Sequence, residues 1–183
     1  MKSNIKTLGE ITSYISKGIV PKYTLESGKN TIRVLNQRCN RNNEITLGPS
    51  RLNDVTKRRV PENKILRIND VLVNSTGVGT AGRVAQITKI NEQLTVDGHM
   101  IILRPNQSID PVFYGYLVKA NQYKIEQLAE GSTGQTEINR DRLLNEIICQ
   151  IPPVEDQITI AYQLRRLDLK IKINKQINAN LAA

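Results

Sequence analysis

Few of the side chains on which enzyme chemistry depends are present in this sequence. It contains one histidine, His99, and two cysteines, Cys39 and Cys149, whose separation matches no metal or redox spacing. His99 lies inside a strand pattern, which favours a structural or DNA-facing imidazole over a general base. The cysteine content indicates a reduced, cytoplasmic setting. We therefore expect neither a metal site nor a catalytic centre in this chain.

Long apolar runs are also absent. No stretch approaches the ~18 residues needed to cross a bilayer, so no membrane span is expected. The N-terminus, Met-Lys-Ser-Asn-Ile-Lys, has no apolar core of the kind that signal peptides carry. With 183 residues, the chain is long enough for one domain with an appendage and too short for two full domains.

Three enzyme-like motifs occur in incomplete form. Pro61-Glu62-Asn63-Lys64 contains the E-x-K of many nucleases, but Asp54 is the only acid close upstream. Ile151-Pro152-Pro153-Val154 lacks the preceding Asn or Asp and the following aromatic residue of an amino-methyltransferase motif. Residues 77–82 match G-x-G-x-x-G, but residues 83–88 alternate like a strand, whereas a dinucleotide site needs a helix there. A β-hairpin with close backbone approach is favoured for this glycine loop.

Acidic residues are too few to balance the basic ones. Lys and Arg number 26 against 17 Asp and Glu, which gives a net charge of +9 and a pI near 9.7. Residues 33–67 hold nine basic and three acidic residues, a net charge of +6. A solvated loop face is one explanation. A surface facing a polyanion, nucleic acid before membrane, is the other and is favoured.

The chain up to residue 151 alternates short strand patterns with polar loops and a few helices. Strands are expected at 31–35, 65–73, 83–87, 95–105 and 146–151. Helices are expected at 111–128, with a break near Asn121, and at 140–144, and Asp110 and Asn139 are their N-caps. This mixture predicts an α+β domain with a mixed sheet.

The last thirty residues predict one long amphipathic helix. Pro152 and Pro153 stand at its start, and Glu155 and Asp156 place negative charge where the helix dipole is positive. About 27 helical residues would extend about 40 Å. Spacings of four and three predict a coiled-coil seam. The seam consists of Ile160, Leu164, Leu167, Ile171, Asn174, Asn178 and Leu181. The alternative is a surface helix packed on its own domain.

Four stretches together resemble the specificity (S) subunit of type I restriction–modification systems, in the form of a half-subunit. They are residues 18–22 after 8–11, 68–73 with 77–83, 131–135 with 138–139, and 151–157 leading through 167–171 to Asn174, Ile177, Asn178 and Leu181. The resemblance implies a target-recognition domain at 1–151 and a helical spacer arm at 152–183. Family members usually carry two such domains, each reading part of a split DNA site, with two helices packed antiparallel between them.

The resemblance also implies partners. Modification subunits that use S-adenosylmethionine and restriction subunits that use ATP would be recruited, so no cofactor is expected on this chain. Because only one copy of the domain and helix is present, we expect a homodimer that reads double-stranded DNA at an inverted, bipartite site. The alternative from another class is a decoy half-subunit that binds modification subunits and reads no DNA.

Two sets of residues are candidates for DNA contact. Amides, hydroxyls and guanidinium groups in three loops suit base edges or neighbouring phosphates. Further lysines and arginines suit contacts with phosphates. The base-edge candidates are Asn36, Gln37, Arg38, Asn40, Arg41, Ser75, Thr76, Thr80, Arg83, Thr133, Gln135 and Thr136. The phosphate candidates are Lys22, Arg51, Lys57, Arg58, Arg59 and Lys64.

Overall fold

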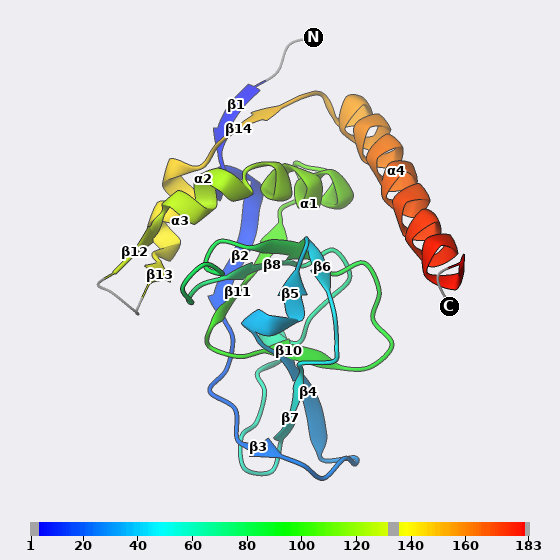
Figure 1. Ribbon diagram of the computed structural model, residues 1–183. Coiled ribbons are helices and arrows are strands. Elements are labelled where there is room, and N and C mark those ends of the chain that lie inside the picture. Colours follow the sequence, from blue (N-terminus) through cyan, green and yellow to red (C-terminus); the bar gives the residue numbers. More distant parts are fainter. Residues whose placement is uncertain (1–3, 132–135, 182–183) are drawn as a thin grey trace.

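The computed structural model of the protein describes residues 4–131 and 136–181 and consists of a three-layered head and one long helix (Figure 1). The expected α+β architecture is confirmed, and so is the long C-terminal helix. Among the described residues, no helix is both long enough and apolar enough to cross a membrane.

The head is organised around an antiparallel sheet buried on both faces. Its strand order is β2 (Thr12–Lys17), β11 (Met100–Pro105), β8 (Val71–Asn74) and β9 (Val84–Gln86). Because side chains alternate along a strand, Ile101 and Leu103 pack into one core, whereas Met100 and Ile102 pack into another. The apolar runs in β8 and β11 therefore separate two cores.

Three helices cover the first core. They are α1 (Pro111–Ala120), α2 (Gln122–Gln127) and α3 (Arg140–Glu146). Asp110 caps α1 by accepting hydrogen bonds from the Val112 and Phe113 amides, and Pro111 follows at the first helical position. The predicted caps and the break at Asn121 are confirmed.

A second, smaller sheet covers the other core. Its strand order is β10 (Leu94–Val96), β4 (Thr31–Leu35), β7 (Arg51–Asp54) and β3 (Tyr23–Thr24), with β10 parallel to β4 and the other pairs antiparallel. Single turns of 3-10 helix join these elements at η1 (Gly9–Ile11), η2 (Gln37–Cys39) and η3 (Glu62–Lys64). Two-stranded pairs complete the head: β1 (Asn4–Thr7) with β14 (Ile148–Ile151), β5 (Asn40–Arg41) with β6 (Glu44–Ile45), and β12 (Ala129–Glu130) with β13 (Glu137–Ile138).

Two strand predictions were wrong in extent. Residues 65–70 form a turn, because the Asp70 carboxylate accepts the Arg67 amide and so diverts the backbone from a ladder. The segment 95–105 is interrupted between β10 and β11, where Asp97 accepts the His99 amide. His99 therefore lies in a turn and is exposed, not inside a strand.

The terminal helix α4 (Val154–Leu181) packs on the head with its first half only. Gln157 is buried, and its Oε1 accepts the Asp110 amide at 2.8 Å. The Tyr116 hydroxyl of α1 donates to the Asp168 carboxylate near the middle of α4 at 2.8 Å. Every residue from 165 to 181 is exposed, and Figure 1 shows this half clear of the head.

Candidate nucleic-acid interface

The structure brings together three polar loops that are far apart in the sequence. The Asn74 side-chain amide donates to the Gln37 backbone carbonyl at 3.1 Å, and this hydrogen bond joins η2 to the end of β8. The Gly77 amide donates to the Thr136 carbonyl at 3.4 Å, and Thr76 forms a β-bridge with Glu137. The base-edge candidates of the loops around 37, 76 and 136 therefore gather at one end of the central sheet.

Glycines in the 75–83 loop permit this close packing. Gly77 has φ 109°, and a Cβ there would collide with Thr80 Oγ1 and Gln37 Oε1. Gly82 has φ 88°, and a Cβ there would collide with the Glu126 backbone in α2. Since β8 and β9 form an antiparallel hairpin, the predicted hairpin with close backbone approach is confirmed.

Burial removes two residues from the base-edge candidates. Asn40 and Ser75 are completely buried. The Asn40 side chain donates to Asn74 Oδ1 at 3.2 Å and to the Arg83 carbonyl at 2.9 Å, so it joins β5 to the central sheet. A base edge cannot reach either side chain in this structure. The expectation that these two residues contact DNA is therefore corrected.

The other base-edge candidates differ in how far they are already engaged. Asn36 caps η2 by accepting the Arg38 amide, and its own amide donates to the Pro49 carbonyl. The Thr76 hydroxyl is 2.8 Å from His99 Nδ1. Arg38 and Arg41 are exposed, while Gln37, Thr76, Thr80, Arg83 and Thr136 are half-buried. Thr133 and Gln135 lie outside the described residues.

An open polar pocket of ≈590 Å³ adjoins these loops. It is lined by Arg41, Asn42, Asn43, Thr80, Arg83 and Gln122. Gln122 Oε1 accepts both the Asn43 side-chain amide at 2.7 Å and the Val84 backbone amide at 3.0 Å, which holds the β5–β6 hairpin against β9. Sequence reasoning missed Asn42, Asn43 and Gln122. The pair Asn42-Asn43 is a turn signal that could have revealed the hairpin, but nothing local identifies Gln122.

The phosphate candidates mostly lie on and beside the second sheet. Buried Asn53 accepts the Lys22 amide and donates to the Arg58 carbonyl, each at 2.8 Å, so it fixes these two cationic segments against each other. The Arg51 guanidinium stacks 3.6 Å from the Tyr23 ring centroid. Lys22, Arg51, Lys57, Arg58 and Arg59 are exposed. One of them, Lys57, is 3.5 Å from the Asp54 carboxylate.

Lys64 differs from the other phosphate candidates. Its ammonium group donates to the Gly18 carbonyl at 2.8 Å and is half-buried. Burial lowers the pKa of Lys64, and the nearby charges of Arg58 and Arg140 lower it further. The hydrogen bond to Gly18 joins η3 to the residue after β2, and the contact of Lys64 with a phosphate stays a prediction.

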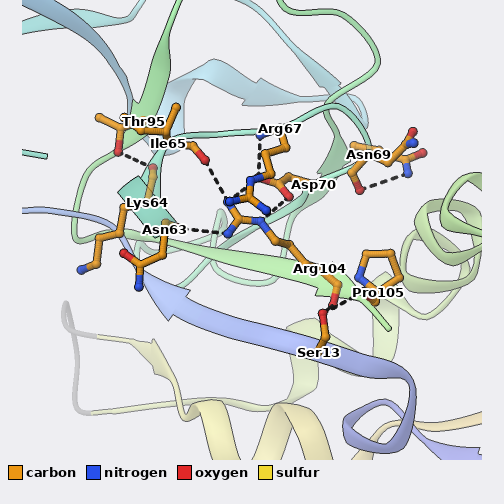
Figure 2. A network of polar contacts seen from close by, with 11 residues as sticks. Ser13, Asn63, Lys64, Ile65, Arg67, Asn69, Asp70, Thr95, Arg104 and Pro105 are labelled. Carbon is orange, nitrogen blue, oxygen red and sulfur yellow. Dashed lines mark hydrogen bonds and ion pairs between the residues drawn. The ribbon is translucent and has the colours of Figure 1, made fainter. Parts of the chain in front are cut away.

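A buried ion pair fixes the segment that carries Lys64 and the turn that follows it. Arg104 on β11 donates from Nε and Nη2 to the Asp70 carboxylate at 2.8 and 3.0 Å (Figure 2). Its guanidinium also donates to the Asn63 and Ile65 carbonyls, each at 2.8 Å. The Asp70 and Arg104 side chains are only 2% and 11% exposed. Arg104 therefore connects the central sheet to η3 and to the turn that follows it.

The free half of α4 exposes two apolar stripes. The predicted seam is open to solvent, with Leu167 and Ile171 54% and 51% exposed, while Leu164 is half-buried beside the head. A second stripe lies on the far side of the helix by its 3.6-residue period. It consists of Ile158, Tyr162, Leu169 and Ile173, whereas Ile177 lies next to the seam residues Asn174 and Leu181. The alternative of a helix packed on its own domain thus describes only the first half.

Within residues 4–131 and 136–181, no three His, Cys, Asp or Glu side chains are grouped so that they could hold a metal ion. The surface instead offers guanidinium, ammonium, amide and hydroxyl groups. All of these groups can donate hydrogen bonds to phosphates, and they can also form hydrogen bonds with base edges.

Comparison with known proteins gives a consistent result. Residues 2–183 match the family described as type I restriction modification DNA specificity domain. The fold is similar to the type I restriction–modification S subunit from M. genitalium, with 18% identity and a TM-score of 0.66 over 94% of this chain and 40% of that one. It is also similar to the HsdS subunit from Thermoanaerobacter tengcongensis, with 20% identity and a TM-score of 0.67 over 95% and 39%.

A third similar structure comes from work on complex assembly and conformational transition of the type I R-M system, with 20% identity and a TM-score of 0.69 over 97% and 41%. This chain thus spans about two fifths of the length of the solved chains that it matches. No curated protein matches it.

Proposed function

Because the chain belongs to the family of type I restriction–modification DNA specificity domains, we propose that it is a DNA-reading specificity subunit. It reads one half of a bipartite site in double-stranded DNA and recruits modification subunits. The observation that carries the proposal is the gathering of three polar loops beside a cationic sheet, on a head attached to a partly free helix.

The chemistry of the two surfaces supports a division of work within the head. Lys22, Arg51, Lys57, Arg58 and Arg59 are exposed cations, which position a protein on the phosphate backbone without reading sequence. The loop end contributes Arg38, Arg41, Thr80 and Arg83, whose polar groups suit base edges or neighbouring phosphates. Asn40 and Ser75 take no part, because both side chains are buried.

The exposed seam of α4 supports a homodimer. Ile160, Leu167, Ile171 and Leu181 present apolar surface that a second copy of the helix would cover. Asn174 and Asn178 interrupt the seam, and buried asparagines select one register and orientation at some loss of stability. A two-fold dimer would place the two heads so that they read inverted half-sites at a spacing set by the helices.

The second stripe of α4 supports recruitment of the modification subunits. Two copies joined along the seam would still expose Tyr162, Leu169 and Ile173 on each helix, and an apolar stripe of this kind indicates a further protein partner. On this proposal the chain has no catalysis of its own. S-adenosylmethionine and ATP are bound by the partner modification and restriction subunits, in the cytoplasm.

Selection from a randomised duplex library by the purified chain tests the proposal. We expect an enriched motif made of two inverted half-sites with fixed spacing. A decoy half-subunit would retain modification subunits in a pull-down and enrich no motif, with or without them. That result would overturn the proposal that the chain recognises a DNA sequence.

Removing two exposed cations beside Asn53 should weaken DNA binding at every sequence. Arg58→Gln with Arg59→Gln is expected to make the slope of log K against log salt shallower by about 2 for each head, because each lost phosphate contact removes about 0.9. Fluorescence anisotropy with a labelled duplex measures this slope. Lys172→Gln with Lys175→Gln on α4 makes the same change in net charge away from the proposed DNA-contacting surface of the head, and it should leave the slope unchanged.

A further inference from the structure

The pocket beside the β5–β6 hairpin is lined by polar and basic residues. Arg41 comes from β5, Arg83 precedes β9, and Gln122 begins α2. The lining residues include two guanidinium groups, three amides and a hydroxyl, and no carboxylate. Its ≈590 Å³ falls in the range of ligand-sized pockets. The pocket therefore suits an anionic, hydrogen-bonding ligand such as a nucleotide within a duplex.

The two turn residues of the hairpin differ in what their side chains do. Asn42 and Asn43 have φ 52° and 59°, as a two-residue hairpin turn requires. The Asn43 amide donates to the Val84 carbonyl at 3.0 Å and to Gln122, so Asn43 holds the turn in place. Asn42 is exposed, and its side chain makes no hydrogen bond to another described residue.

The Asn42 side chain is therefore not needed to build the turn. Glycine adopts a positive φ at no steric cost, so glycine would satisfy the backbone here at least as well. Gln122 and Asn43 fix the backbone on which Asn42 stands. The Arg83 guanidinium is held nearby through Nη2 and the Gly79 carbonyl at 3.0 Å. The backbone that carries Asn42 is therefore fixed, and its side-chain amide can pair with a ligand in a pocket that two guanidinium groups also line.

We propose that Asn42 is a specificity-determining residue that reads an adenine, with Arg41 and Arg83 on the adjacent phosphates. An asparagine amide pairs with adenine N6 and N7 through two hydrogen bonds, which no other base offers in the major groove. Gln122 is the positioning residue, because it fixes the hairpin without reaching the base. This inference deepens the proposed function and rests on it.

Repeating the duplex-library selection with Asn42→Gly tests the inference. The variant keeps the turn and removes the amide, so one adenine of the wild-type motif should lose its preference by roughly tenfold or more, while the other positions keep theirs. Asn42→Asp also keeps the turn and offers only acceptors, so it should move the preference at the same position away from adenine. Both variants should unfold thermally like wild type.

Asn69→Gly is the matched control. Asn69 is also left-handed, with φ 71°, and lies in the turn before β8, outside the pocket (Figure 2). Its motif should equal that of wild type. A wild-type motif that Asn42→Gly leaves unchanged, or weakens equally at all positions, would overturn this inference alone. If the wild-type chain enriches no motif, the proposed function fails and this inference fails with it.

Discussion

Replacing Asp70 by asparagine is expected to destabilise the protein by about 3–5 kcal/mol, because the change leaves the Arg104 guanidinium buried without its counter-charge. The substitution keeps the size of the side chain, so lost packing contributes little. For a chain of this length the loss corresponds to a fall in melting temperature of roughly 10 °C. Thermal or urea unfolding followed by circular dichroism measures the effect.

The control for this prediction is an exposed ion pair of the same kind. Arg33 Nε is 2.7 Å from the Glu92 carboxylate, but the two side chains are 30% and 43% exposed. Glu92→Gln should therefore change stability by no more than about 1 kcal/mol. If Asp70→Asn behaved like Glu92→Gln, the Arg104 network would not fix the η3 segment to the sheet as inferred from its four hydrogen bonds.

Disrupting the seam of α4 should abolish self-association without unfolding the head. Leu167→Asp with Ile171→Asp places two charges where each helix would meet its partner, and both side chains are exposed in the single chain. Burying a Leu or Ile is worth about 1.5–3 kcal/mol, so four lost side chains per dimer should weaken association by roughly 1,000-fold or more. Sedimentation equilibrium measures the association, and the melting temperature of the head should not change at low protein concentration.

Leu169→Asp with Ile173→Asp is the matched variant on the second stripe. Because these residues lie on the far side of α4, they should leave self-association intact and reduce binding of the modification subunit. A wild-type chain that sediments as a monomer at every concentration would contradict the two-fold arrangement, whatever the variants do.

Local signals in the sequence were sufficient for the elements that depend on local chemistry. Asp110 and Pro111 predicted the start of α1, and the two prolines before Val154 predicted the start of α4. Strand alternation after Gly82 predicted a hairpin and argued against a dinucleotide site, and β8 and β9 have that form. Each of these signals lies within a few residues of the feature that it predicts.

Features that depend on distant partners could not be predicted in this way. In the sequence, Asn40 is one amide among several in a polar loop. In the structure it is buried and hydrogen-bonded to Asn74 and to the Arg83 carbonyl. Lys64 was predicted to contact a phosphate, and the sequence does not reveal that its ammonium group donates to the Gly18 carbonyl, 46 positions earlier. Sequence composition reports the chemistry of a loop, whereas tertiary contacts decide which of its side chains reach solvent.

The second core shows the same limit at the level of the fold. The runs in β8 and β11 indicated buried strands, but they did not show what covers each face. Residues of one strand divide between a core beneath three helices and a core beneath the second sheet. Asn53 of the second sheet in turn joins the segments of Lys22 and Arg58 beside that sheet, a grouping that their spacing in the sequence does not reveal.

Binding of DNA by the head is tested most directly by equilibrium binding of the purified chain to duplex DNA over a range of salt concentrations. Five exposed cations on each head predict that log K falls linearly with log salt, with a slope of about −4.5 for each head. Binding that is absent at low salt, or that does not change with salt, would contradict the account.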